Sequence, residues 1–436
     1  MMGKADDMED RSRSGWNTKE GDSAGRTERL RLMLIVPMLH QGGFERVCVE
    51  TARLLEPYFE VCIVLFDSRD IAYDITGLRV IDLHLGVRES IPGKLLNVWK
   101  RSLAVRRLKR RLSIDIAYSF GPTANMVNVF SGRRAEIWTG IRSYMDMGSP
   151  RKIRLFSGMS DRVLCCSRRI EEEVREKYGC KRAVALCNPL NVEALRSRAG
   201  AEEPRLPWQD RGRIIASMGR EDDVKGFWHL IKSFSLVQKE VSDARLMIIG
   251  EGDFEEYKEL AKGLGVEEQV YFTGLQRNPF PYLEAARLYV LTSYNEGFPN
   301  ALIEAMALGV PVAATDCMTG PREILMKEYS SSEGTAETLW GDYGILLPNM
   351  SPEKNLDPGD ITQEEERLAE VMKRMLTESE LWQGYERAAL ERSRDFSEER
   401  YVDTIRQLAG ERQGCLHSQG GCDKMGKYRG TDPGSG

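Results

Sequence analysis

Histidine is scarce in this sequence, with four His among 436 residues. No two of them have the spacing of a metal-ligand pair, and Cys415 and Cys422 lack a second Cys-x-x-Cys half, so no structural zinc site is expected. Asp222 and Asp223 form a poor Mg²⁺ site because Lys225 would compete for their carboxylates. The sequence therefore predicts chemistry that needs no metal.

Long apolar runs are also missing. No run of about 18 apolar residues occurs, so no membrane-spanning helix is expected. The longest apolar run, 32–39, follows a charged segment and lacks a small-residue cleavage site, which indicates a core strand rather than a signal peptide. The net charge of -5 and the pI near 5.7 disfavour nucleic-acid binding. The nine cysteines are scattered, and those in apolar segments are typical of buried, reduced thiols in a cytoplasmic protein: Cys48, Cys62, Cys165, Cys166 and Cys187.

Short apolar segments alternate with helical segments along most of the chain. The first series of expected strands is 32–37, 61–66, 78–83, 114–120, 135–141, 162–167 and 183–187. The second series is 214–218, 246–249, 270–273, 288–293, 310–314 and 345–347. Such alternation predicts an α/β protein with two doubly wound, mostly parallel Rossmann-like domains and a ligand site in the cleft between them.

Composition sets the expected domain boundaries. Two polar end segments are expected to be disordered, a leader over 1–30 and a Gly-rich tail over 412–436. Between them we expect an N-terminal domain (31–196), a linker (197–210), a C-terminal domain (211–385) and C-terminal helices (386–411). These helices are candidates to cross back to the N-terminal domain, and residues 362–411 are expected to be helical throughout.

Two carboxylates, Glu296 and Glu304, stand on either side of an expected turn. An apolar strand ends at Ser293, Pro299 and Asn300 indicate a turn and an N-cap, and 301–308 indicates a helix. Glu296 would lie at the carboxyl edge of the sheet, where open α/β sheets bind ligands. The free amides at a helix start suit phosphate or sugar oxygens. An ordinary exposed loop is the alternative.

Two further candidate loops each follow the first strand of an expected domain. Gly219, Arg220 and Lys225 follow the strand at 214–218, and the two cations could hold a diphosphate. The alternative is a solvated loop in which both cations pair with residues 221–223. Gly42 and Gly43 follow the strand at 32–37, in the layout that brings backbone N–H groups to an anion, with a plain turn as the alternative.

The segment 94–112 is strongly basic and contains no acid. Its apolar residues recur near helical spacing: Leu95, Trp99, Leu103, Val105, Leu108 and Leu112. A basic amphipathic helix with Trp favours contact with anionic lipid. An ordinary Rossmann helix with a basic outer face is the equal alternative. Arg151, Lys152, Arg154 and Phe156 would extend the basic surface.

These residues together resemble the retaining glycosyltransferases of family 4, which have the GT-B fold and use nucleotide sugars. Glu296 and Glu304 match the Glu-x7-Glu element of that family, and the segment 297–312 matches its flanks. Gly219, Arg220, Lys225 and Gly226 resemble its diphosphate clamp. Other matching elements are Gly42-Gly43-Phe44-Glu45-Arg46, Asn188-Pro189, Phe272-Thr273-Gly274 and Gly320-Pro321-Arg322-Glu323 with Asp316. The resemblance covers about residues 31–395 and extends to enzymes of bacterial surface polysaccharides.

The resemblance implies roles for these residues. Glu296, Arg220 and Lys225 would be catalytic, with Glu296 at the donor sugar and the two cations at the departing diphosphate. Glu304 would bind the ribose hydroxyls. The other donor-binding residues would be Gly42, Gly43, Gly219, Gly274, Gly297, Phe298, Pro299, Asn300, Ala301 and Leu302. The family His that contacts the donor sugar is absent after the strand at 114–118, where the sequence reads Ser119-Phe120-Gly121-Pro122-Thr123.

The expected function is that of a metal-independent, retaining glycosyltransferase without cofactor. It would move a hexose or N-acetylhexosamine from a nucleotide-diphosphate sugar, most simply a UDP-sugar, to a lipid-linked or surface-polysaccharide acceptor. A cytoplasmic enzyme at the inner face of the plasma membrane fits this acceptor. Two alternatives stay open: a UDP-sugar 2-epimerase of the same fold, and a non-catalytic sugar-nucleotide-binding protein.

Overall fold

The computed structural model describes residues 29–40, 42–86, 90–210, 212–329 and 334–419. Leucine-rich and β-branched runs become buried strands, and amphipathic segments between them become helices. The first half contains the strands β1 (Arg31–Val36), β2 (Glu60–Leu65), β3 (Val80–Asp82), β4 (Ile116–Phe120), β5 (Glu136–Ile141), β6 (Arg162–Cys165) and β7 (Ala183–Ala185). Its helices are α1 (Gly43–Leu55), α2 (Ile91–Arg111), α3 (Pro122–Phe130), η1 (Tyr144–Gly148), α4 (Pro150–Met159), α5 (Arg168–Tyr178) and α6 (Val192–Ala199).

The second half repeats the alternation. Its strands are β8 (Arg213–Met218), β9 (Ala244–Ile249), β10 (Val270–Phe272), β11 (Leu288–Leu291), β12 (Val312–Thr315), β13 (Leu339–Trp340) and β14 (Ile345–Leu347). Its helices are η2 (Asp223–Lys225), α7 (Phe227–Glu240), α8 (Glu255–Gly263), η3 (Glu267–Gln269), α9 (Phe280–Glu284), α10 (Asn300–Ala307), α11 (Pro321–Leu325), α12 (Gln363–Thr377) and α13 (Ser379–Ser393). The chain ends in η4 (Arg394–Phe396) and α14 (Glu398–Gln419).

Each half is built around one seven-stranded sheet. The strand orders are β3-β2-β1-β4-β5-β6-β7 and β10-β9-β8-β11-β12-β14-β13. The first sheet is parallel throughout, and the second has one antiparallel pair, β13 with β14. The predicted α/β class with two doubly wound, mostly parallel sheets is therefore confirmed. Strand order reverses between β1 and β4 in the first sheet and between β8 and β11 in the second, and such points are where doubly wound sheets bind ligands.

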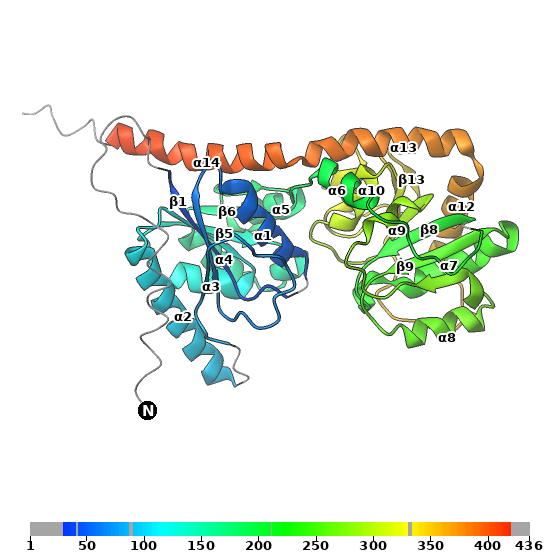
Figure 1. The fold of residues 1–436 in the computed structure, drawn as a ribbon, viewed down its shortest axis with the longest axis horizontal. Coiled ribbons are helices and arrows are strands. Elements are labelled where there is room, and N and C mark those ends of the chain that lie inside the picture. Colours follow the sequence, from blue (N-terminus) through cyan, green and yellow to red (C-terminus); the bar gives the residue numbers. More distant parts are fainter. Residues whose placement is uncertain (1–28, 41, 87–89, 211, 330–333, 420–436) are drawn as a thin grey trace, which may run out of the picture.

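The C-terminal helices connect the two halves. Figure 1 shows α13 over the second half and α14 running on across the first. Tyr401, Val402 and Ile405 of α14 pack in the same apolar cluster as β1 and α1. The Tyr401 hydroxyl lies 2.7 Å from Thr51 Oγ1, and the Leu190 N–H donates to Phe396 O at 2.8 Å. The chain thus returns to the first half beside the segment where it left.

Several sequence-based boundaries differ from the structure. Residues 197–199 of the expected linker belong to α6. The region 362–411 is interrupted at Glu378 and again at η4, and α14 continues to Gln419, into the segment expected to be disordered. Gly43, expected in a loop after the strand at 32–37, is the first residue of α1, and the Gly42 C=O accepts from the Arg46 N–H. The leader up to residue 28 and the tail from residue 420 lie outside the described residues.

Candidate functional site

The carboxyl edge of the second sheet collects most predicted site residues. β8 and β11 are neighbours, with Ile215 aligned to Leu288. Gly219 to Lys225 follow β8, and Glu296 follows β11 before α10 begins. Both loops therefore leave the sheet at the point where strand order reverses, as a doubly wound ligand site requires.

Lys225 and Glu296 form an ion pair at this edge. Lys225 Nζ lies 2.8 Å from Glu296 Oε1, and the side chains are 25% and 13% exposed. The Gly219 backbone packs against the Lys225 side chain, so that a Cβ at this position would stand 2.9 Å from Lys225 Cε. Thr319 Oγ1 donates to the Glu296 carbonyl and holds the loop from the other side. The structure brings together two residues that are 71 positions apart in the sequence.

Arg220 does not join this pair. Its side chain is 65% exposed, and its guanidinium is 4.0 Å from Asp222, one of the residues named in the solvated-loop alternative. Lys225 departs from that alternative, because its partner is Glu296. Gly274 lies after β10, where its φ of +67° favours glycine, and a Cβ there would meet open space.

Glu304 lies on α10 and is 2% exposed. Its Oε1 accepts from Arg46 Nη2, on the first turn of α1 in the other half. Arg46 Nε also lies 3.4 Å from Glu50 Oε1, one helical turn further along α1. The negative charge of Glu304 raises the pKa of Arg46. Arg46 appeared in the sequence only as part of the Gly-rich loop, and its partner could not be inferred from spacing.

The Gly-rich loop makes different contacts from those expected of an anion site. The Gly42 N–H donates to the Tyr73 hydroxyl at 2.8 Å, and that hydroxyl donates to Gly42 O at 2.6 Å. A Cβ at Gly42 would stand 2.2 Å from Glu45 Oε2, so the carboxylate folds back over the glycine. Gly43 is solvent-exposed, and a Cβ there would meet no atom within 4 Å. Burial raises the pKa of Glu45 to about 7, against opposing effects of its own backbone N–H and of Arg220.

The turn between Glu296 and Glu304 rests on the first half. A Cβ at Gly297 would stand 2.5 Å from Arg142 O, so only glycine fits there. Asn300 is not the N-cap: α10 begins at Asn300, and the capping residue is Pro299. The Asn300 side chain instead accepts from Asn188 Nδ2 at 2.6 Å, which leaves no capping hydrogen bond.

The remaining turn residues contribute mainly packing. The Phe298 ring packs edge-to-face against Phe396, with ring centroids 5.4 Å apart. Leu302 is fully buried, and its N–H donates to Pro299 O at 3.1 Å. Ala301 is partly buried against the same apolar cluster. Any donor contact through these residues would therefore use backbone atoms.

Some buried polar atoms beside β11 lack partners. Ser293 Oγ and Asn295 Oδ1 are buried and make no hydrogen bond within the described part of the chain. Buried polar atoms almost always have partners in native proteins. Their position between β11 and Glu296 suits a polar ligand at this edge.

Arg142 and Glu323 were not predicted as site residues. Arg142 follows β5, donates to Asn188 Oδ1, and lies 5.8 Å above the Phe120 ring. A single cation directly after an apolar strand was the available signal. Glu323 on α11 accepts from the Arg168 N–H across the two halves at 2.8 Å, and burial raises its pKa to about 7.

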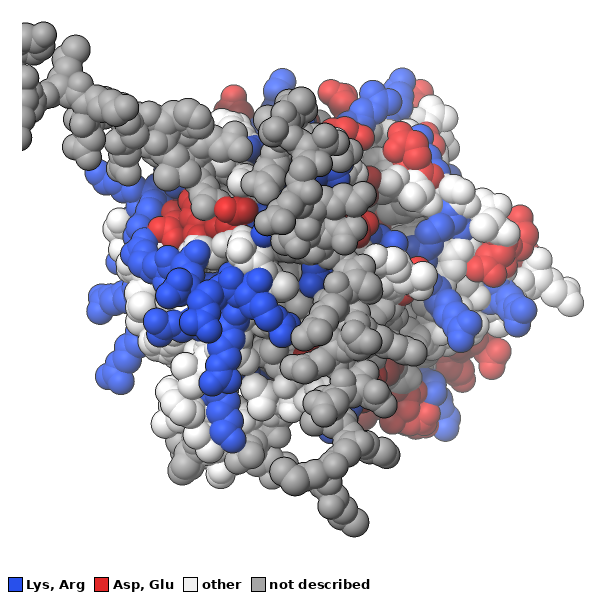
Figure 2. Space-filling view, turned by 60° about the vertical axis from the view of Figure 1, so that its left-hand side comes forward, with Lys and Arg blue, Asp and Glu red and all other residues white. Residues whose placement is uncertain are grey.

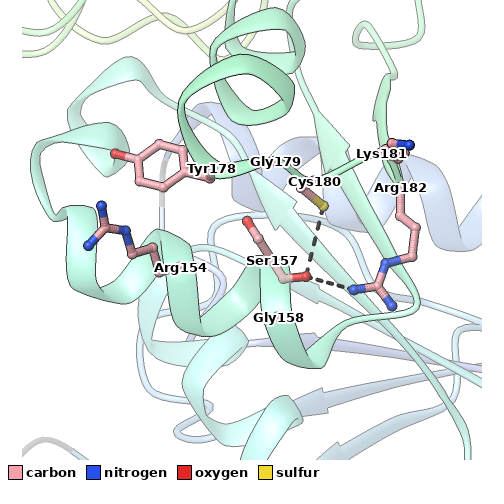
Figure 3. A pocket seen from close by; sticks show the side chains of 8 residues that line it. All are labelled: Arg154, Ser157, Gly158, Tyr178, Gly179, Cys180, Lys181 and Arg182. Carbon is pink, nitrogen blue, oxygen red and sulfur yellow. Dashed lines mark hydrogen bonds between the residues drawn. The ribbon is translucent and has the colours of Figure 1, made fainter.

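A pocket of about 440 Å³ lies elsewhere, in the first half. Figure 3 shows it between α4 and the end of α5, with Arg154 and Tyr178 on one side and Arg182 on the other. Arg182 Nη2 donates to Ser157 O at 2.9 Å. Its lining includes no predicted catalytic or donor-binding residue. The pocket lies by the chain leading into β7, at the sheet edge opposite the carboxyl ends of the strands.

The basic segment 94–112 forms most of α2 and the residue after it, and its cations divide into two groups. Lys109 is buried and donates to Asn128 Oδ1 at 2.8 Å, and Arg101 is buried over the Phe66 ring. Val105, Leu108 and Leu112 pack inward, whereas Leu95 and Trp99 are 69% and 60% exposed. The exposed cations are Lys94, Lys100, Arg106, Arg107, Arg110 and Arg111. Figure 2 shows Lys and Arg side chains gathered on the surface of this half.

The described residues contain free cysteine thiols but no cluster of metal-ligating side chains. Within these residues no group of three or more His, Cys, Asp or Glu could hold a metal ion. Their cysteines are free thiols and are buried, except that Cys187 is only partly buried. Cys422 and the Cys415 side chain lie outside the description. No helix in the described ranges combines the length and apolar character needed to cross a membrane.

Comparison with known proteins gives consistent results. Residues 200–335 match the family described as Glycosyl transferases group 1. This segment contains the candidate site residues Arg220, Lys225, Glu296 and Glu304. The matched segment runs from just after α6 to beyond α11 and is similar to group 1 glycosyltransferases. An uncharacterized glycosyltransferase of Methanocaldococcus jannaschii is 37% identical over 193 residues, which cover 43% of this chain and 47% of that protein. The chain thus matches about half the length of that relative.

Two further similarities extend over most of this chain. One is a 4-α-N-acetylgalactosaminyltransferase of Campylobacter jejuni, named for an acceptor on diphospho-undecaprenol, which is 26% identical over 87% of this chain and 100% of its own. The other is Anabaena HepE solved in complex with UDP, with a TM-score of 0.67 at 17% identity over 88% of this chain and 100% of that chain. The structural similarity identifies the fold as GT-B, as the sequence predicted.

Proposed function

We propose that this protein is a glycosyltransferase that transfers a sugar from a UDP-sugar to a lipid-linked or polysaccharide acceptor, with retention of configuration. The observation that carries the proposal is the Lys225–Glu296 pair, 2.8 Å apart at the carboxyl edge of β8 and β11. Glu304 and the unpartnered Ser293 and Asn295 oxygens surround the same edge. A cation, two carboxylates and unsatisfied polar atoms suit a sugar diphosphate.

The donor would lie along the turn between the two acids. Glu304 would accept hydrogen bonds from the ribose hydroxyls, and Glu296 would contact the donor sugar. Backbone amides of residues 297–302 and Gly219, Gly274, Gly42 and Gly43 remain the proposed donor contacts. Gly42 would need to exchange its Tyr73 hydrogen bond for such a contact, because its N–H already has that partner.

The reaction breaks the bond between the anomeric carbon and the diphosphate oxygen. Negative charge then grows on the diphosphate, and Lys225 would stabilise it more strongly than in the ground state. Lys225 has three N–H donors, so it can keep Glu296 and still reach a phosphate oxygen. Arg220 is exposed and able to swing toward the same diphosphate. The acceptor hydroxyl would enter from the face that the diphosphate leaves, and its proton would go to the departing phosphate oxygen.

The acceptor proposal rests on the relatives and on the surface of α2. The Campylobacter relative is named for an acceptor carried on diphospho-undecaprenol. Leu95, Leu96 and Trp99 are exposed on the helix that also carries the exposed cations. Apolar and cationic groups on one helix suit a surface of anionic lipid at the inner face of the membrane.

Mass spectrometry of reactions with UDP-, GDP- and ADP-sugars and lipid-diphosphate saccharides tests the proposal. Transfer from a UDP-sugar with release of UDP is the expected result, and an α-linked product from an α-linked donor shows retention. UDP-sugar epimerisation without acceptor would contradict the proposal. EDTA should leave the rate unchanged, and a requirement for Mg²⁺ or Mn²⁺ would overturn the metal-independent mechanism.

A further inference from the structure

A buried ion pair joins the two halves at the carboxylate proposed to bind ribose. Glu304 is 2% exposed, and its Oε1 accepts from Arg46 Nη2. Its other oxygen, Oε2, makes no hydrogen bond within the described residues. One oxygen is therefore fixed from the first half, while the other remains available to a ligand.

We propose that Arg46 is a positioning residue for the nucleotide-sugar donor. It holds Glu304 through Oε1, so that Oε2 faces the ribose hydroxyls in a fixed orientation. The inference rests on the proposed function, because it assumes that Glu304 binds ribose. Arg46 itself acts through the carboxylate and touches no reacting atom.

The surroundings of the pair explain why a cation is needed. A carboxylate as buried as Glu304 is costly unless it is paired. The other charged groups near it are Glu50 on α1 and Arg198 on α6. Glu50 repels Glu304, and Arg198 is partly desolvated, which lowers its pKa. Among the residues that the structure describes, Arg46 is the cation that donates a hydrogen bond to Glu304.

The placement of Arg46 is also constrained. It lies on the first turn of α1, which Gly42 and Tyr73 anchor through two hydrogen bonds. Glu50 at 3.4 Å orients the guanidinium from the next turn. Because Arg46 and Glu304 come from different halves, the ribose site is complete only when the halves are in contact. Donor affinity should therefore depend on a residue outside the donor half.

Calorimetry of UDP binding to the full chain tests this role. Arg46→Ala should weaken UDP binding at least about tenfold, since a charge-assisted hydrogen bond that orients the ligand's partner is lost. Arg46→Lys, which keeps the charge, should recover most of the affinity. In turnover assays Arg46→Ala should raise the donor KM more than it lowers kcat. Arg53→Ala, at an exposed position of the same helix, is the matched control and should bind UDP normally.

A double-mutant cycle separates positioning from a general structural effect. Arg46→Ala should have little further effect on UDP affinity once Glu304→Ala is present, because both changes remove the same interaction. Unchanged or tighter UDP binding by Arg46→Ala, or additive losses in the double variant, would overturn the inference. Melting temperatures show whether each variant is folded. If Arg46→Ala does not fold, Arg46→Gln, which removes the charge but keeps most of the side chain, replaces it in the cycle. Failure of the unmodified protein to bind UDP, GDP or ADP would instead refute the proposed function.

Discussion

The two halves share one topology but contribute to the candidate site in different ways. In the second half, Lys225 and Glu296 belong to adjacent loops of one sheet and pair with each other. In the first half, Arg46, Asn188 and Arg142 reach the second half: Arg46 contacts Glu304, Asn188 contacts Asn300, and the Arg142 backbone lies against Gly297. The second half supplies the Lys225–Glu296 pair, and the first half contributes single residues that contact the turn and helix beside it.

This difference explains where sequence patterns are dense. A site made within one sheet edge needs a fixed spacing of residues along nearby loops, so it leaves a compact motif. A contribution made across a boundary needs only one side chain at a suitable place, so it leaves almost none. The matched family region, residues 200–335, accordingly lies in the second half and its approach.

The largest effect is expected within the second half. Lys225→Ala should lower kcat roughly a hundredfold to a thousandfold, the usual cost of removing one donor to a developing negative charge. UDP release measured at several donor concentrations gives kcat and KM separately. Lys258→Ala, at an exposed ion pair on α8, is the control. An unchanged kcat/KM would mean that this half does not stabilise the leaving group through Lys225.

The contact between the halves is tested by Gly297→Ala. The added Cβ would stand 2.5 Å from Arg142 O, so the first half must move away from the turn. We expect kcat to fall roughly tenfold to a hundredfold, because small misplacements are costly in catalysis. Gly384→Ala on α13, where a Cβ meets no atom within 4 Å, should keep normal turnover. Normal turnover in both variants would show that close apposition of the halves is not required.

The exposed cations of α2 are a feature of the first half alone, and their proposed role is binding to anionic lipid. Replacing Arg106, Arg107, Arg110 and Arg111 with Gln should weaken binding to anionic vesicles about tenfold or more, since each cation near such a surface contributes up to about 1 kcal/mol. Vesicle sedimentation measures the change, and UDP affinity should stay the same. Neutralising Lys239, Lys258 and Lys262 of the second half is the control. Equal binding in all proteins would favour an ordinary Rossmann helix with a basic outer face.

A last effect, on stability rather than on activity, concerns Glu323, which links α11 to the Arg168 N–H of the other half. Burial raises its pKa from 4.5 to about 7, so the folded protein holds this proton more strongly than the unfolded chain. The resulting stabilisation is complete below about pH 4.5 and is lost as the pH rises through about 7. Glu323→Gln cannot ionise and keeps an acceptor for Arg168.

Melting temperatures between pH 5 and pH 8 measure the Glu323 effect. The unmodified protein should lose up to about 3 kcal/mol more stability over this range than Glu323→Gln. Some pH dependence should persist in the variant, because burial also raises the pKa of Glu45 and Glu50 to about 7. Glu380→Gln, at an exposed site on α13, should follow the unmodified protein. Parallel curves for all three proteins would contradict the effect.

Much of the fold could be predicted because its signals are local. Buried parallel strands appear as short apolar runs such as 32–36 and 288–291, and amphipathic helices show their own period. Helix boundaries depend on distant contacts as well: Asn300 has the sequence position of a capping residue, yet its side chain accepts a hydrogen bond from Asn188 instead. On α2, period alone could not tell that Lys109 is buried on Asn128 while Trp99 is exposed.

The α/β architecture and the loops that carry Lys225, Glu296 and Glu304 could be predicted from the residues alone. Spacing along the chain encodes these features, because each depends on neighbours within one strand, turn or helix. The partners of these side chains follow from the three-dimensional arrangement: Lys225 pairs with Glu296, and Glu304 pairs with Arg46, which is 258 positions away. Contacts between distant residues depend on how two sheets meet, and a single sequence records no direct trace of that geometry.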